Sequence, residues 1–360
     1  MDVDALIPPG LQFAPTVAFH IIFSNLAIGL AGYLAVLEGL WLATRNEVFK
    51  ALYVFWLKIF AVSLCLSVVT SLAMSYPVIA WEMLAPLVLA ASLLAIMLFG
   101  WKKAGPGLHA AATVLVALGA LIWAFWVSSA YSWTPLSPSS ASRLMHVTLA
   151  AYLTTALVVG AASAWRLLKR QDELESQMSL RMAVGILAIV APMQLLVGDM
   201  SGKDVMLPQP AKLAAVETFW GTEQAFHLTA LPRAAEAQDL RPLAPGDGGP
   251  TAISFWSFRV MAGLGVAMIV LGAWGAWLCA RSAPERSGAF LRACVVMGPA
   301  GFVAAITGWT IAMLQATGGP QPVSANQVSA WMSGLLVICA AGALYILRLV
   351  AQGPAGPAPR

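Results

Sequence analysis

Long apolar runs constrain this chain more than any other feature of its sequence. Each run can supply the ~20 residues that cross a bilayer, and hydrocarbon leaves the backbone no hydrogen-bond partner outside the segment itself, so each must be helical. Charged residues make up 10% of the 360 positions and hydrophobic ones 60%, whereas soluble domains carry roughly 25% charged residues. The sequence therefore predicts an all-α, polytopic membrane helical bundle with nine spans, at about 14–43, 51–74, 78–101, 108–131, 145–168, 181–200, 255–280, 289–315 and 326–351.

The basic residues predict how this bundle is oriented. With the N-terminus outside and the C-terminus inside, thirteen Lys and Arg residues fall on the inner side and six on the outer side, with Lys58 inside a span. Inner loops are the ones that carry excess Lys and Arg. The net charge of +4 is then a signal of topology and does not indicate nucleic acid. We expect helices one to six in 1–200, an outer-surface loop in 201–254, helices seven to nine in 255–352 and a flexible tail in 353–360.

Two of the four histidines, His20 and His146, lie near the outer ends of predicted spans. A buried imidazole needs a polar partner or a metal, so either helix-to-helix hydrogen bonding or ligation would explain them. Met261 follows Arg259 at the outer end of the seventh run. Histidine and methionine together are an axial ligand pair for haem iron, and an arginine beside them would neutralise a propionate. Core filling is the alternative for Met261.

Acidic residues inside spans are functional candidates because a buried carboxylate is costly. Glu82 lies early in the third run, at the outer depth of His20 and His146. Glu38 lies near the inner end of the first run, where a headgroup-level position among basic residues is expected. His109 is expected to be solvated or interfacial. Asp199 is expected to close the sixth helix at the outer surface.

The polar interval after the sixth run contains a candidate substrate site. Lys212 and Glu217 put both signs of charge beside the apolar and aromatic segment 213–220, which suits a weakly polar, hydroxylated ring at the membrane edge. An amphipathic connector is the alternative reading. The four cysteines are widely spaced, without a Cys-x-x-Cys pair, which disfavours structural zinc, iron–sulfur clusters and covalently attached haem.

Taken together, these motifs resemble subunit I of the cytochrome bd quinol oxidases over essentially the whole chain. The matching segments are Leu11-Gln12-Phe13-Ala14 with His20, Phe55-Trp56-x-Lys58-x-Phe60, His146, Gly198-Asp199-x-Ser201-Gly202, Lys212 to Glu217, and Phe258-Arg259-x-Met261.

This resemblance implies a quinol:oxygen oxidoreductase in the bacterial inner membrane. Quinol would be oxidised at Lys212 and Glu217. Electrons would pass through a low-spin haem b on His146 and Met261 to a second haem, b or d, near His20 and Glu82, where dioxygen is reduced. A second polytopic subunit is the implied partner.

Departures from the family pattern gather in the oxygen-reducing half. Ala90 replaces a second glutamate of the third helix, Ile306 replaces a carboxylate of the eighth, and the fourth-helix positions used for proton entry read Ala120 to Trp123. We therefore expect two haems per chain. Two alternatives stay open: a related quinol-oxidising haem protein that has lost oxygen reduction, and a non-enzymatic haem-binding membrane sensor.

Overall fold

The computed structural model describes residues 9–74, 84–130, 138–169, 173–206, 248–281, 284–314 and 325–354. These residues form helices and short connections, without a strand among them. In chain order the helices are α1 (Pro9–Thr44), α2 (Glu47–Met74), α3 (Leu84–Phe99), the short 3₁₀ helix η3 (Gly100–Lys102), α4 (Pro106–Ala130), α5 (Pro138–Leu168), α6 (Glu173–Met206), α8 (Gly248–Arg281), η5 (Pro284–Arg286), α9 (Gly288–Met297), α10 (Ala300–Leu314) and α11 (Ala325–Gln352).

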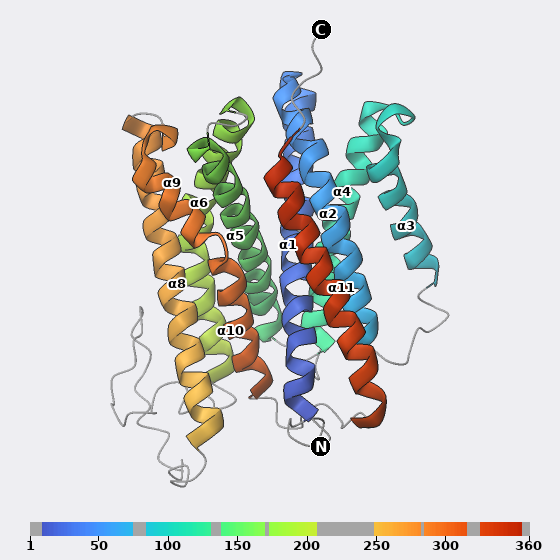
Figure 1. The fold of residues 1–360 in the computed structure, drawn as a ribbon, viewed down its shortest axis with the longest axis vertical. Coiled ribbons are helices and arrows are strands. Elements are labelled where there is room, and N and C mark those ends of the chain that lie inside the picture. The colour runs from blue at the N-terminus through green and yellow to red at the C-terminus, as the bar shows by residue number, and fades with distance from the viewer. Residues whose placement is uncertain are drawn as a thin grey trace.

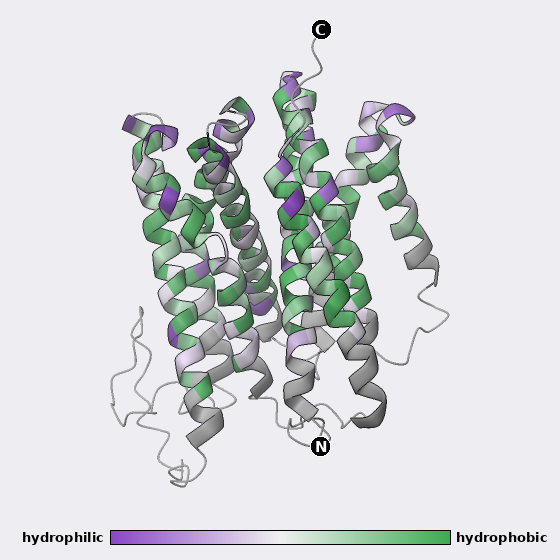
Figure 2. Ribbon diagram, viewed as in Figure 1, coloured by the Kyte–Doolittle hydropathy of each residue, from purple (hydrophilic) through white to green (hydrophobic). Residues whose placement is uncertain are grey.

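The long helices stand side by side as a bundle, and α1 begins at the opposite end from that where α11 finishes (Figure 1). Hydrophobic residues dominate the length of the helices, and many hydrophilic ones lie near the end where α1 meets α2 (Figure 2). We call this the inner end, following the predicted orientation. Among the described residues, seven helices are long and apolar enough to cross a membrane, and α3 and α4 contribute shorter apolar stretches. The predicted polytopic helical bundle is confirmed.

Several helix boundaries differ from the expectation, and three of the differences bear on the fold and the site. The eighth predicted span is divided into α9 and α10 by a turn at Gly298 and Pro299. Helix α6 continues to Met206, so Asp199 lies about two turns before its described end and does not close it. Helix α8 begins at Gly248, before the apolar run. Polar residues can extend a helix beyond the hydrocarbon because water then solvates their side chains, and apolar runs therefore underestimate helix length.

Small residues let these helices approach closely. A Cβ atom built on Gly272 of α8 would lie 2.9 Å from the backbone carbon of Leu187 on α6, and one on Gly301 of α10 would lie 2.7 Å from the Cα atom of Thr154 on α5. Contacts of this kind are typical of membrane helices, where backbone proximity replaces the hydrophobic effect as the source of packing energy. They also fix the register of α6 with α8 and of α5 with α10.

The largest buried side chains lie between α1 and α2. Leu30 and Leu34 of α1 pack with Tyr53, Trp56 and Phe60 of α2, all at most 1% exposed. This tight pair of helices holds in place the polar groups around His20, described below.

Candidate functional site

His146 of α5 is held by helix α6. The Nε2 atom of Gln194 lies 3.2 Å from its Nδ1 atom and 3.4 Å from its Nε2 atom. A Cβ atom built on Gly198, one turn further along α6, would lie 3.2 Å from His146 Cε1. Glycine at 198 lets the backbone of α6 come close to the ring, and a larger residue there would require the ring to shift by a few tenths of an ångström. Gln194 could not be selected from the sequence, because its contact with His146 depends on the packing of α5 against α6.

Met261 of α8 has a similar neighbour on α10. A Cβ atom built on Gly308 would lie 3.1 Å from the Met261 sulfur atom. Each candidate ligand thus contacts a glycine of a neighbouring helix. A larger residue at either glycine would press on the His146 imidazole or on the Met261 sulfur.

Two independent registers place His146 and Met261 at one depth. Gly272 of α8 contacts Leu187 of the antiparallel helix α6. Counting eleven residues back along α8 leads to Met261, and counting eleven residues forward along α6 leads to Gly198. Gly198 in turn contacts His146. Starting from the contact of Gly301 with Thr154, seven residues lead to Gly308 on α10 and Val147 on α5. Both steps use the same rise of about 1.5 Å per residue. His146 and Met261 therefore lie level within the group formed by α5, α6, α8 and α10.

Arg259 lies on the surface at the outer end of this group. Its guanidinium carbon is 3.2 Å from the centroid of the Phe255 ring, and its Nη1 atom donates to the Phe255 carbonyl oxygen at 3.4 Å. Residue 255 is one turn nearer the outer end, so the guanidinium is directed along α8 toward that surface. Its expected role at a propionate stays a prediction.

His20 of α1 lies against a group of hydroxyls on α1 and α2. Its Nδ1 atom is 3.0 Å from Thr70 Oγ1, and Ser24 Oγ lies 3.3 Å from its Nε2 atom and 2.7 Å from Ser67 Oγ. Thr70 donates its own hydroxyl proton to the carbonyl oxygens of Leu66 and Ser67, at 2.8 and 3.0 Å. This arrangement favours Thr70 as the acceptor from His20, and hence the tautomer with the imidazole proton on Nδ1 and a lone pair on Nε2.

The residues at both histidines fit a haem. A porphyrin needs one or two axial donors, and each described site offers an imidazole, with a thioether level with His146. The buried Gln194 Oε1 atom has no partner among the described residues. Turning the amide over would bring this oxygen to His146 Nδ1, where it would accept the ring proton and leave Nε2 for iron.

Comparison with known proteins identifies the family. A sequence profile described as Cytochrome bd terminal oxidase subunit I matches residues 10–136, 134–245 and 234–352. The chain belongs to this family.

Two relatives and one solved structure agree with this assignment. Cytochrome bd-II ubiquinol oxidase subunit 1 of Escherichia coli (strain K12) is 29% identical over 267 residues, which are 61% of this chain and 52% of that relative. Cytochrome bd ubiquinol oxidase subunit 1 of Bacillus subtilis (strain 168) is 25% identical over 428 positions, covering 95% of this chain and 90% of the relative. The bd oxidase from Geobacillus thermodenitrificans has the same fold, with a TM-score of 0.78 at 20% identity over 96% of this chain and 98% of that one.

Three residues expected to be functional in a bd-type subunit I lie outside the described ranges, namely Glu82, Lys212 and Glu217. Among the departures, Ile306 lies in α10. The hydroxyls of Thr307 and Thr310 nearby donate to carbonyl oxygens of their own helix, those of Val303 and Ile306, at 2.9 and 2.8 Å. This stretch of α10 therefore presents neither a carboxylate nor a free hydroxyl proton.

Glu38 of α1 and His109 of α4 are buried, contrary to what was expected from the sequence. The side chains are 1% and 3% exposed and pair with each other, with His109 Nδ1 at 2.6 Å from Glu38 Oε1. The expectations of a headgroup-level glutamate and of a solvated or interfacial histidine are both wrong. The error arose because α1 and α4 meet only in the tertiary structure, where each residue supplies the other's partner.

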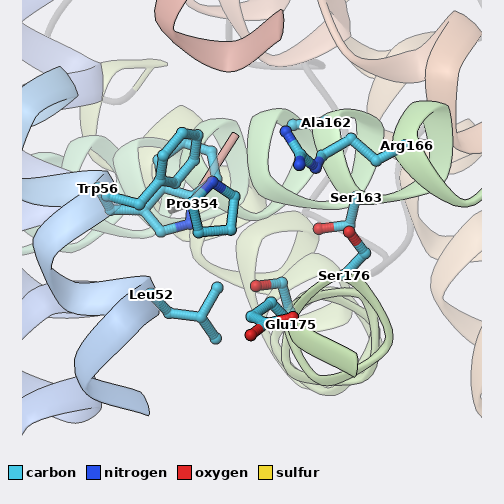
Figure 3. A pocket seen from close by; sticks show the side chains of 10 residues that line it. Leu52, Trp56, Ala162, Ser163, Arg166, Glu175, Ser176 and Pro354 are labelled. Carbon is cyan, nitrogen blue, oxygen red and sulfur yellow. The ribbon is translucent and has the colours of Figure 1, made fainter. Parts of the chain in front are cut away.

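A small pocket at the inner end is separate from both histidine sites. Figure 3 shows Arg166 and Ser163 of α5, Glu175 and Ser176 of α6, Trp56 of α2 and Pro354 around it. Arg166 Nη1 donates to the carbonyl oxygen of Val350 at 3.4 Å. Gly353 follows with φ of 72°, and a Cβ atom there would overlap the guanidinium group. Through these contacts Arg166 anchors the end of α11. It lies twenty residues along α5 from His146, about 30 Å away, so the pocket is remote from that histidine.

Proposed function

We propose that this chain oxidises quinol at the outer membrane surface and passes the electrons through a low-spin haem b on His146 and Met261 to an oxygen-reducing haem near His20. Membership of the family shows the general function: the chain is a component of a bacterial cell-membrane quinol oxidase, a quinol:oxygen oxidoreductase. The proposed haem ligands are supported by one observation: His146 and Met261 lie at the same depth in the group formed by α5, α6, α8 and α10.

The protein's task at the first haem is to hold the two ligands. Gln194 would fix the orientation and tautomer of His146 by accepting its Nδ1 proton, as carbonyl and carboxylate groups do for metal-bound histidines. Because residues 198 and 308 are glycines, no side chain from these two positions presses on the ring or the sulfur. When bound, the haems supply one-electron chemistry, which divides the electron pair of a quinol.

At the second haem, Thr70 would hold His20 in the tautomer that presents Nε2 to iron. Glu82, expected at the same outer depth, is proposed to act on the other side of the haem, and the macrocycle is b or d. Ile306 offers iron no ligand, and its neighbours Thr307 and Thr310 are committed to backbone carbonyls. This supports two haems per chain.

For quinol, Lys212 and Glu217 are proposed to bond the ring oxygens, with Glu217 accepting a departing proton. They belong to the proposed outer-surface loop of 201–254. Oxidation there would release both hydroxyl protons outside, while the protons used in water formation would come from inside. The reaction would thereby conserve energy as a charge and proton gradient.

A second polytopic subunit is the proposed partner, since the cytochrome bd family works with a subunit II. Helix α11 offers one surface that such a partner could cover, since Val337, Ile338, Leu344 and Leu347 are each more than half exposed in the isolated chain. A partner or lipid must cover them. Full activity of the purified chain as a monomer in mild detergent would contradict the partnership.

Quinol-driven oxygen consumption, recorded together with the haem optical spectrum of the purified complex, tests the function. Rapid uptake that stops with a quinol-site inhibitor is the expected result. Haem reduction by quinol without oxygen uptake would overturn the oxidase proposal in favour of a quinol-oxidising relative that lost oxygen reduction. Bound haem that quinol does not reduce would overturn both in favour of a sensor.

A further inference from the structure

Two cations lie over two tryptophan rings at the inner end, where α1 meets α2. The Lys50 ammonium is 5.5 Å from the centroid of the Trp41 ring and 5.6 Å from that of the Trp101 ring. The Arg45 guanidinium is 5.3 Å from the Trp41 ring, and the two indoles pack with their centroids 5.1 Å apart. We call Trp41, Arg45, Lys50 and Trp101 the tryptophan–cation cluster. It has no role in the function proposed above.

The cluster lies at the level of lipid headgroups. It surrounds the turn between two candidate membrane spans, the first ending at Thr44 and the second beginning at Glu47. Tryptophan is enriched at this boundary because one part of the indole is apolar and the N–H is polar. Arg45 is exposed and the Lys50 side chain is 35% exposed. Both cations are therefore accessible to a headgroup of the surrounding bilayer.

Contact with a ring leaves hydrogen-bond donors of both cations available for an anion. A cation over an aromatic face is attracted by the ring quadrupole and does not need to donate to an oxygen atom. Among the described residues, the Arg45 side chain forms no ion pair. Lys50 pairs with Glu47 at 3.5 Å, and Glu47 also accepts from Trp41 Nε1 at 3.5 Å. An exposed pair of this kind contributes little and is readily exchanged for a phosphate.

The backbone at Arg45 is strained. Its φ angle is 54°, the only positive value among the described residues other than glycine. Its N–H donates to the carbonyl oxygen of Trp41 at 2.7 Å, which closes the end of α1. Glycine, or less often asparagine, is usual at such a position, yet the asparagine here is Asn46, whose Oδ1 accepts from the N–H of Val48 and begins α2. A long cation kept at a strained position indicates that its side chain is functional.

Further positive charge lies beside the cluster. Lys102 and Lys103 directly follow Trp101 and are exposed, and Figure 2 shows hydrophilic residues both at this turn and at the end of α1. With the two cations of the cluster they make four basic residues, against the single acid Glu47 in segments 44–50 and 100–106. Four or more basic residues beside a membrane span are typical of sites for anionic lipids.

Two simpler tryptophan–cation pairs occur elsewhere at the inner end. Lys169 lies 3.9 Å from the ring of Trp165, and Arg281 lies 4.9 Å from that of Trp277. Each pair has one cation over one ring, four residues away on the chain. In the cluster, by contrast, two cations and two rings are contributed by the α1–α2 turn and by η3. The simpler pairs therefore provide a control for the general effect of basic residues at a membrane surface.

We propose that the tryptophan–cation cluster binds the phosphate of an anionic phospholipid, phosphatidylglycerol in the first instance. The Arg45 guanidinium and the Lys50 ammonium donate to the phosphate oxygens. The two indoles lie beside the glycerol and the first methylene groups, and Lys102 and Lys103 add to the attraction. The bound lipid would join the α1–α2 turn to the turn that follows α3. This inference does not depend on quinol oxidation.

Native mass spectrometry of the haem-loaded complex, with phosphatidylglycerol titrated into the detergent, tests the inference. Arg45→Gly combined with Lys50→Gln should weaken binding of the first lipid at least about tenfold, since each basic residue near an anionic surface contributes roughly fivefold. Lys169→Gln combined with Arg281→Gln is the matched control, because it removes the same charge from the simpler pairs. It should change that affinity less than about twofold.

Equal losses in the two double variants would overturn the inference, because they would show a diffuse effect of surface charge. Unchanged binding in the variant of the cluster would overturn it as well. Displacement of the lipid by inorganic phosphate at the same concentration would make the cluster a site for a soluble anion and would also overturn it.

Arg45→Gly alone separates binding from folding if the double variant does not assemble. Glycine relieves the left-handed backbone, so the thermal unfolding temperature should be unchanged or raised. The affinity for phosphatidylglycerol should nevertheless fall about fivefold. Normal affinity in this stably folded variant would refute the lipid site.

Discussion

Replacing Met261 by Leu removes a single sulfur atom from the proposed low-spin haem while keeping nearly the same side-chain volume. The Met261 sulfur lies against Gly308, where a Cβ atom would come within 3.1 Å. A leucine branch has to fit the same space, and volume-conserving exchanges of this kind usually cost less than about 1.5 kcal/mol. The bundle should therefore remain folded, and a spectral change should report the ligand.

The expected result is loss of the low-spin signature from the reduced-minus-oxidised optical spectrum, with the total haem content lowered or unchanged. Met268→Leu is the matched control. Met268 lies two turns further along α8, is 3% exposed and packs in the core with Leu187 and Leu271, so its replacement should have a similar effect on thermal unfolding and none on the spectrum. An unchanged low-spin spectrum in Met261→Leu would refute the assignment of the sulfur as a ligand.

Four further outcomes are expected. Gly308→Ala should disturb the low-spin spectrum without removing the sulfur, because the new methyl group would press on Met261; an unaltered spectrum would contradict the register of α8 with α10. Gln194→Leu should shift the haem midpoint potential by removing the proposed hydrogen bond to His146, as redox titration would measure; an unshifted potential counts against that bond. Glu217→Gln should slow quinol oxidation with the haem spectra intact; a normal rate would make the loop a connector. Pyridine haemochrome and iron analysis should give two haems per chain, and three would mean that another residue replaces the carboxylate missing at Ile306.

The fold class and its family could be predicted from the sequence alone. Apolar runs of membrane length admit only helices, because the backbone must satisfy its own hydrogen bonds in lipid. The positions of His20, His146 and Met261 near the outer ends of their runs could also be predicted, because depth in a membrane helix is counted along the sequence. The comparisons confirm the family. The ligand roles stay predictions.

What surrounds those residues was decided by the tertiary structure. Gln194 against His146, Thr70 against His20, and Glu38 paired with His109 each join helices whose facing sides no pattern in the sequence specifies. Glu38 looked like a surface acid because only its own helix was visible. The physical reason is that lipid-facing and buried sides of membrane helices are equally apolar, so composition fixes how deep a residue lies but leaves its neighbours to packing.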